Sequence, residues 1–97
     1  MKKILTALIM ATSMNATASD TTCAEYVQAY KSGNITNAYY KFQAGISDAS
    51  MTDASTLRNK FNRLTDQGQG EMVMYKVALR CYSRPSTPLV RIIQVTL

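Results

Sequence analysis

The 97-residue sequence contains no histidine, and this absence removes several common catalytic arrangements. A Ser-His-Asp triad and a Cys-His pair both need an imidazole as general base, so neither can be built. Histidine and clustered cysteine are also the usual zinc ligands, and the two cysteines here stand far apart. We therefore expect no metal and no other cofactor.

Acidic residues are scarce as well, with six Asp and Glu in the whole chain. Two carboxyl groups would suffice for glycoside hydrolysis. The six acids are scattered, however, and neither a glycine-rich loop nor a cofactor motif accompanies them. A domain this small also has difficulty enclosing a cleft that excludes water. We predict that the protein has no catalytic residues and is not an enzyme.

Long apolar runs are absent except at the N-terminus. Lys2 and Lys3 precede a mostly apolar stretch at 4–14, and the small residues Ala-Thr-Ala follow at 16–18. A positive start, a short apolar stretch and an A-x-A end are the three parts of a secretory signal peptide. The stretch is shorter than the roughly 18 apolar residues of a membrane-spanning helix. The sequence therefore predicts a signal peptide at 1–18.

Cleavage between Ala18 and Ser19 would remove 18 of the 97 residues and leave one domain of 79 residues, 19–97. The short, doubly basic start is typical of bacterial export, so we expect the protein in the periplasm or beyond. No cysteine follows the cleavage position, and a lipid anchor is not expected. We predict no stable membrane anchor and a monomeric protein.

Basic residues outnumber acids by 11 to 6, but they form no dense block. Two of the lysines belong to the signal peptide, so 9 basic and 6 acidic residues remain in the predicted domain, a net charge of +3. Binding to nucleic acid usually requires a clustered basic face. The sequence therefore does not predict a nucleic-acid partner.

The predicted domain has two cysteines, Cys23 near its start and Cys81 near its end. An even number of cysteines in an oxidising compartment indicates a disulfide. Closing a loop of this length stabilises a chain by roughly 4 kcal/mol. The total stability of such a domain is on the order of 5–10 kcal/mol. We predict that the Cys23–Cys81 bond decides whether the domain stays folded.

Apolar residues recur with a helical period through the first two thirds of the domain. The expected helix starts are Ser19 or Asp20, then Asn34 or Thr36, then a residue within 50–53, and the expected stops are Gly33 and the link 67–70. The expected inward-facing residues are Cys23, Tyr26, Val27 and Tyr30 in the first helix, Ile35, Ala38, Tyr39, Phe42 and Ile46 in the second, and Ala54, Leu57, Phe61 and Leu64 in the third.

Residues 71–97 fit two periods. A period of two predicts a β-hairpin that turns at 84–88. A period of 3.6 predicts two helices, the second capped by Thr87 with Pro88 at its first position. We predict an all-α fold, a small bundle of about five short helices with one disulfide. The alternative is an α+β fold with a C-terminal hairpin at 71–97.

Both ends of the domain resemble the spackle proteins of T-even bacteriophages. Residues 70–81 read GEMVMYKVALRC, a Met/Tyr-rich segment that follows a Gly-rich link and ends in Leu-x-Cys, and an Ile-Ile pair and a Val follow within 92–95. Near the predicted cleavage site, Cys23 is followed by Glu25 and Tyr26. The middle of the chain, residues 31–66, resembles the spackle proteins only in its helical pattern.

The resemblance implies a function. Spackle-type proteins are exported to the periplasm of the infected cell, where they inhibit the tail lysozyme of an incoming phage and so exclude superinfection. The family fold is helical and two-lobed, with a disulfide joining its parts. The family places an acidic surface against a basic region around the lysozyme cleft, whereas this domain has a net charge of +3. Candidate acidic contacts are Asp48, Asp53, Asp66 and Glu71.

Tyr39 and Tyr40 are adjacent, so they cannot share one helix face. We expect one of them in the core and Tyr40 as an exposed anchor, because tyrosine is enriched at interfaces.

The surroundings of the two cysteines also resemble the small periplasmic acid-stress chaperones of the HdeA type. A chaperone of this kind is switched on at low pH, which needs many acidic residues that become protonated, and this chain has few. An immunity protein against a cell-wall-degrading toxin is a third possibility.

Overall fold

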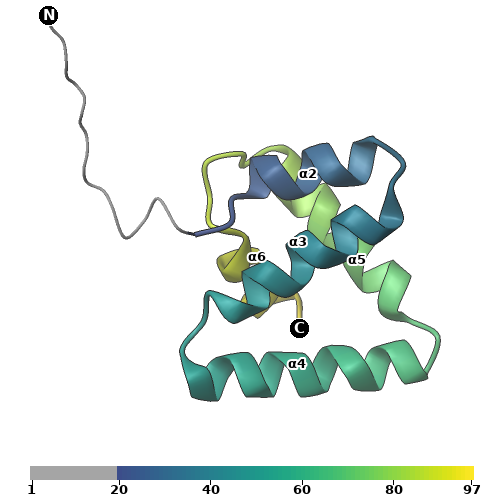
Figure 1. Cartoon of the computed structure of the whole chain (residues 1–97), viewed down its shortest axis with the longest axis vertical. Coiled ribbons are helices and arrows are strands. Elements are labelled where there is room, and N and C mark those ends of the chain that lie inside the picture. The colour runs from purple at the N-terminus through teal and green to yellow at the C-terminus, as the bar shows by residue number, and fades with distance from the viewer. Residues whose placement is uncertain (1–19) are drawn as a thin grey trace, which may run out of the picture.

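A computed structural model describes residues 20–97, so the predicted signal peptide at 1–18 and the Ala18–Ser19 cleavage site lie outside the described residues. The helices are α2 (Cys23–Lys31), α3 (Ile35–Ser47), α4 (Met51–Asp66), α5 (Gly70–Tyr82) and α6 (Leu89–Thr96) (Figure 1). Within 20–97 there is no β-strand, only an isolated bridge between Thr22 and Pro88. The predicted all-α fold is confirmed, and the alternative hairpin at 71–97 is wrong.

Side-chain caps begin three of the helices. Thr22, Asn34 and Ser50 each accept a hydrogen bond from the backbone N–H three residues further on, at 3.0–3.2 Å. Such caps satisfy N–H groups that have no partner within the helix. Asn34 and Ser50 lie among the predicted starts. The predicted start at Ser19 or Asp20 is wrong, because Thr22 is the cap of α2.

The other helix boundaries are set by backbone geometry. Gly33 follows α2 with a φ of +82°, in the left-handed region that glycine adopts without strain, as predicted for a helix stop. The predicted cap at Thr87 is wrong. Pro88 has an extended ψ of 134° and stands before the first turn of α6, and the Thr87 carbonyl instead accepts a 2.9 Å hydrogen bond from the N–H of Cys23.

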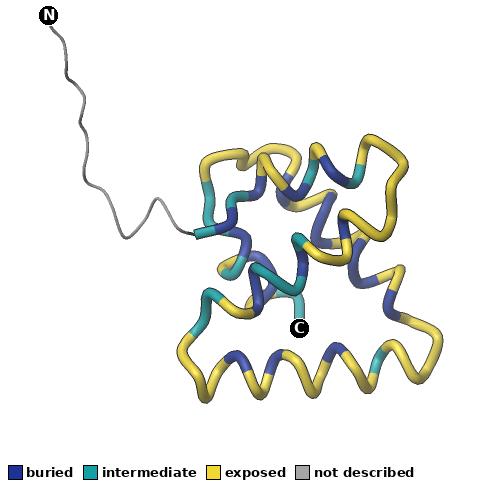
Figure 2. Tube along the Cα trace, in the orientation of Figure 1, coloured by how far each residue is buried: buried dark blue, intermediate teal, exposed yellow. Residues whose placement is uncertain are grey.

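The five helices of the described residues all contribute to one hydrophobic core. Its largest fully buried side chains are Tyr26, Phe42, Phe61, Ile46, Leu89, Ile93 and Val77, together with both cysteines. Figure 2 shows the buried positions of α4 on the side that faces the other helices. The described residues therefore form a single globule rather than the two lobes that the resemblance implies.

The last helix packs closely against α3, which explains why the tail is helical. α6 buries Leu89, Ile92 and Ile93, one face at a spacing of three and four residues. At the contact, a Cβ added to Gly45 would lie 2.8 Å from Cδ2 of Leu89. The missing side chain at Gly45 thus makes room for Leu89. β-branched residues at 90, 92, 93 and 95 favour a strand locally, but this tertiary contact needs a helix.

Two predicted core residues lie nearer the surface than expected. α3 buries Ala38, Phe42 and Ile46, which are four residues apart. Ile35 and Tyr39 fall beside this stripe and are 46% and 41% exposed, so their predicted burial is wrong. Both line a depression between α3, α4 and α5.

The predicted disulfide between Cys23 and Cys81 is confirmed. It joins the first residue of α2 to the last turn of α5, and both residues are fully buried. Helices that are far apart in the chain are thereby fixed side by side. The described residues contain no free cysteine.

Candidate functional site

A depression of about 300 Å³ lies where α3, α4 and α5 meet. Its lining residues are Ile35, Thr36, Tyr39, Tyr40, Phe61, Thr65, Glu71 and Met74. Two of the residues predicted to bind a partner, Tyr40 and Glu71, are therefore brought together although they are 31 positions apart in the chain. We refer to this depression as the acidic aromatic site.

Aromatic rings form one wall of the acidic aromatic site. The ring centroid of Tyr39 lies 6.2 Å from that of Phe61 and 6.1 Å from that of Tyr40, with the two tyrosine rings edge to face. Phe61 is buried in the core, whereas Tyr40 is 65% exposed. The rings thus lead from the core to solvent, and Tyr40 is exposed, as the sequence predicts.

Glu71 carries the only charge among the described residues that line this depression. Within the part of the chain that the structure describes, its carboxylate forms no ion pair, since the one ion pair there joins Lys41 to Glu25 at 3.3 Å. Aromatic faces attract cations, and a carboxylate accepts hydrogen bonds from arginine or lysine. This chemistry suits a cationic side chain with an apolar stem.

The four predicted acidic contacts do not form one surface. Asp48 and Asp53 lie near the start of α4, whereas Asp66 ends α4 and Glu71 follows in the first turn of α5 (Figure 1). A helix rises 1.5 Å per residue, so the 16 residues of α4 separate the two pairs by roughly 20 Å. Of these four acids only Glu71 lines the acidic aromatic site, and Asp66 directly follows Thr65, which also lines it.

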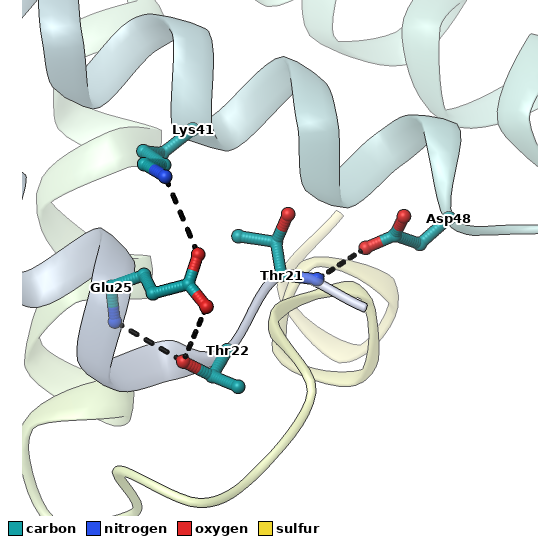
Figure 3. Close-up of polar contacts among 5 residues, drawn as sticks. All are labelled: Thr21, Thr22, Glu25, Lys41 and Asp48. Atoms are coloured by element: carbon teal, nitrogen blue, oxygen red, sulfur yellow. Dashed lines mark hydrogen bonds and ion pairs between the residues drawn. The ribbon is translucent and has the colours of Figure 1, made fainter. Parts of the chain in front are cut away.

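Asp48 has a role inside the fold. Its carboxylate accepts a 2.8 Å hydrogen bond from the backbone N–H of Thr21, as Figure 3 shows. Thr21 is buried, and its carbonyl accepts a second bond from the N–H of Leu89 at 2.8 Å. Asp48 thus fixes the segment before α2 against the end of α3.

The other three acids differ in how the helix dipole affects them. Asp53 and Glu71 lie in the first turn of their helices, where a negative charge is favourable. Asp66 lies at the C-terminal end of α4, where the dipole disfavours it. No feature of the fold explains an acid at 66, which keeps it a candidate for contact with a partner.

A second depression, of about 510 Å³, lies between α2 and α5. Its lining residues are Ala24, Val27, Gln28, Lys31, Ser32, Cys81, Tyr82 and Pro85. Among these residues Lys31 carries the only charge, and neither a carboxylate nor an imidazole is present.

One tyrosine has a strongly shifted pKa, and it lies in the core. Burial raises the pKa of the Tyr26 phenol above its ordinary value near 10, and the neighbouring Tyr30 adds to the rise. The protonated hydroxyl donates a hydrogen bond to the carbonyl of Met74. This shift reflects the packing of Tyr26 and marks no reactive group.

Residues 20–97 contain no group of three or more His, Cys, Asp and Glu side chains close enough to hold a metal ion. Among the helices that the structure describes, none is both long and apolar enough to cross a membrane.

Comparisons with protein-family models, with curated proteins and with solved structures found no match for this chain. The candidate site therefore rests on the geometry of its own residues. Sequence reasoning identified Tyr40 and Glu71 but missed Ile35 and Tyr39 as lining residues. Their positions in the sequence could have indicated this, because residues 35, 39 and 40 lie beside the face of α3 that is buried.

Proposed function

We propose that this protein is exported to the bacterial periplasm, where it binds and inhibits the tail lysozyme of an incoming phage and so excludes superinfection. One observation carries the proposal: the exposed ring of Tyr40 and the unpaired carboxylate of Glu71 meet in one depression. This surface suits a basic partner, and the resemblance implies a basic region around the lysozyme cleft as the target.

The resemblance and the site share a segment of the chain. The motif at 70–81 coincides with α5, which supplies Glu71 and Met74 to the acidic aromatic site. The predicted signal peptide and the disulfide are both consistent with an oxidising compartment outside the cytoplasm. These features support an exported inhibitor over an enzyme.

Inhibition by this surface needs no chemistry from the inhibitor. Exposed tyrosines at the centre of an interface often supply a large part of the binding free energy. Glu71 would accept charge-assisted hydrogen bonds from a lysine or arginine of the partner, and Asp66 would add to the attraction from nearby. The bound protein would then cover the lysozyme cleft and keep peptidoglycan out.

A variant series tests the proposed surface. Tyr40→Ser should raise the inhibition constant at least tenfold, and Glu71→Gln should raise it less while weakening its dependence on salt. Tyr82→Ser is a matched control, because Tyr82 is 66% exposed and lies away from the acidic aromatic site, near the C-terminal end of α5. If Tyr40→Ser inhibits as well as the unchanged protein, the acidic aromatic site is not the inhibitory surface.

A further inference from the structure

A stripe of apolar side chains runs along the outside of α5. Met72, Tyr75, Leu79 and Tyr82 are spaced by three, four and three residues, and each is at least half exposed. They lie on the side of α5 opposite the buried Val77. At 1.5 Å per residue the stripe is about 15 Å long. Exposed apolar patches of this kind on a small protein indicate an interaction surface.

Helix α2 widens this stripe into a face. The ring centroid of Tyr30 lies 6.4 Å from that of Tyr75, and Val27 and Tyr30 are partly buried between the two helices. We call the set formed by Val27, Tyr30, Met72, Tyr75, Leu79 and Tyr82 the α2–α5 face. A shallow depression of about 220 Å³ runs between its two helices.

Basic residues border the α2–α5 face. The Nζ of Lys31 lies 5.6 Å from the ring centroid of Tyr82 on the α2 side. On α5, the exposed Lys76 lies four residues after Met72 and three before Leu79, at the edge of the stripe. Arg80 and Arg84 are exposed on the α6 side instead, where Arg80 donates a 3.4 Å hydrogen bond to the carbonyl of Val95.

The acids lie away from the end of the face that Lys31 and Tyr82 form. Glu25, the acid of α2, lies on the α3 side in its ion pair with Lys41 (Figure 3). Glu71 lies one helical turn before Tyr75 and borders the opposite end of the face. The two depressions that Lys31 and Tyr82 line have no acidic residue in their lining. This end of the α2–α5 face, which we call its Tyr82 end, therefore combines apolar side chains with positive charge.

This charge pattern selects the occupant. A second copy bound through the Tyr82 end of the face would place Lys31 against Lys31, because a two-fold interface pairs a surface with itself. The occupant must instead be anionic and must accept an apolar ridge. An anionic lipid bilayer has both properties, since its headgroups attract lysine and arginine and its interface takes tyrosine and leucine.

We infer that the α2–α5 face binds the surface of an anionic phospholipid bilayer. Leu79, Tyr75 and Tyr82 enter the boundary between headgroups and acyl chains. Lys31 and Lys76 meet the lipid phosphates. Binding is peripheral and reversible. The Tyr82 end of this face lies at the opposite end of α5 from Glu71, so a molecule bound to the membrane through that end keeps the acidic aromatic site free for a lysozyme.

Vesicle co-sedimentation tests this inference. The protein is used without residues 1–18, because the apolar stretch 4–14 would itself bind lipid, and the remaining chain holds all five helices and the disulfide. It should sediment with vesicles of phosphatidylglycerol and phosphatidylcholine, sediment little with phosphatidylcholine alone, and be released by high salt.

Paired variants locate the face. Lys76→Glu and Leu79→Ser should each weaken binding to the anionic vesicles about fivefold or more. Their matched controls, Lys60→Glu and Met51→Ser, change exposed residues of α4 and should leave binding unchanged. Circular dichroism should be the same for all four variants, because every position is exposed.

The outcomes separate this inference from the proposed function. Tyr82→Ser should weaken vesicle binding and leave lysozyme inhibition intact, and Tyr40→Ser should do the reverse. Failure to sediment with anionic vesicles overturns the inference, leaving an acidic protein as the partner class for the face. Equal binding to both vesicle types, or equal binding by Lys76→Glu, overturns it as well. Self-association that Leu79→Ser abolishes would assign the face to a second copy.

Discussion

The hydroxyl of Tyr26 donates a 2.7 Å hydrogen bond to the carbonyl oxygen of Met74, 48 positions further along the chain. This buried bond ties α2 to α5, the same two helices that the Cys23–Cys81 disulfide joins. α5 supplies residues both to the acidic aromatic site and to the α2–α5 face. The position of α5 relative to α2 therefore controls both candidate surfaces.

Replacing Tyr26 by phenylalanine should lower the free energy of unfolding by about 1 kcal/mol at neutral pH. The variant keeps the ring packed against Phe42 and loses only the hydroxyl that bonds the Met74 carbonyl. Urea unfolding followed by circular dichroism measures the difference. Tyr30→Phe is the control, because Tyr30 is only partly buried. An unchanged urea midpoint for Tyr26→Phe would show that this hydrogen bond makes no net contribution to stability.

The same residue predicts a loss of stability in alkali. Burial raises the pKa of Tyr26 in the folded protein above the value near 10 that it has when unfolded. Its contribution is complete below about pH 10 and is lost as the pH rises toward the folded pKa, because the unfolded state releases its proton first. The stability difference between the unchanged protein and Tyr26→Phe should shrink between about pH 10 and pH 12. A constant difference over this range would contradict the assignment.

Removing the disulfide should be among the most damaging single changes to the fold. Its loop spans 58 positions, so reduction should lower the free energy of unfolding by roughly 4 kcal/mol. The double variant Cys23→Ala, Cys81→Ala should match the reduced protein in thermal unfolding, and reductant should not affect it further. A protein whose melting temperature is insensitive to reductant would contradict this prediction.

Gly45→Ala tests the contact between α3 and α6. The added Cβ would lie 2.8 Å from Leu89 Cδ2, and such overpacking typically costs about 1–3 kcal/mol. Alanine gains up to about 1 kcal/mol over glycine in helix propensity, so we expect a net loss of about 1–2 kcal/mol in urea unfolding. Gln43→Ala on the same helix should cost little. Stabilisation by Gly45→Ala would mean that Leu89 moves aside without strain.

Asp48→Ala should destabilise the fold without weakening the binding of a partner. The change removes the acceptor for the buried Thr21 N–H, which should cost about 1–2 kcal/mol of stability. Asp53→Ala, at an exposed position nearby, should cost less. Lysozyme inhibition should be the same for both variants at a temperature where both are folded. A selective loss of inhibition in Asp48→Ala would place a contact surface at the start of α4.

Local signals explain which parts of the fold were predictable. Gly33, Asn34 and Ser50 mark helix boundaries because their own backbone or side-chain chemistry sets them. The cysteine pair follows from its number and the expected compartment. Residues 71–97 were ambiguous because apolar residues there fit both periods, and the close contact of Gly45 with Leu89 that favours the helix is invisible to local pattern.

The candidate site was predictable only in part, for a related reason. Tyr40 follows from its adjacency to Tyr39, since two neighbours cannot both face the core. The burial of Ile35 and Tyr39 was overestimated because their exposure depends on where α4 ends and α5 begins. The separation of Asp48 from Glu71 depends on the length of α4 and the direction in which it runs, which spacing in the sequence does not give.

The central claim is that this protein inhibits a phage tail lysozyme, and a titration tests it most directly. The protein without residues 1–18 is added in increasing amounts to a purified tail lysozyme that degrades peptidoglycan at neutral pH. We predict that activity falls toward zero near one equivalent, and that Tyr40→Ser requires a clear excess. Full lysozyme activity at a large excess of folded, disulfide-bonded protein would contradict the proposed function.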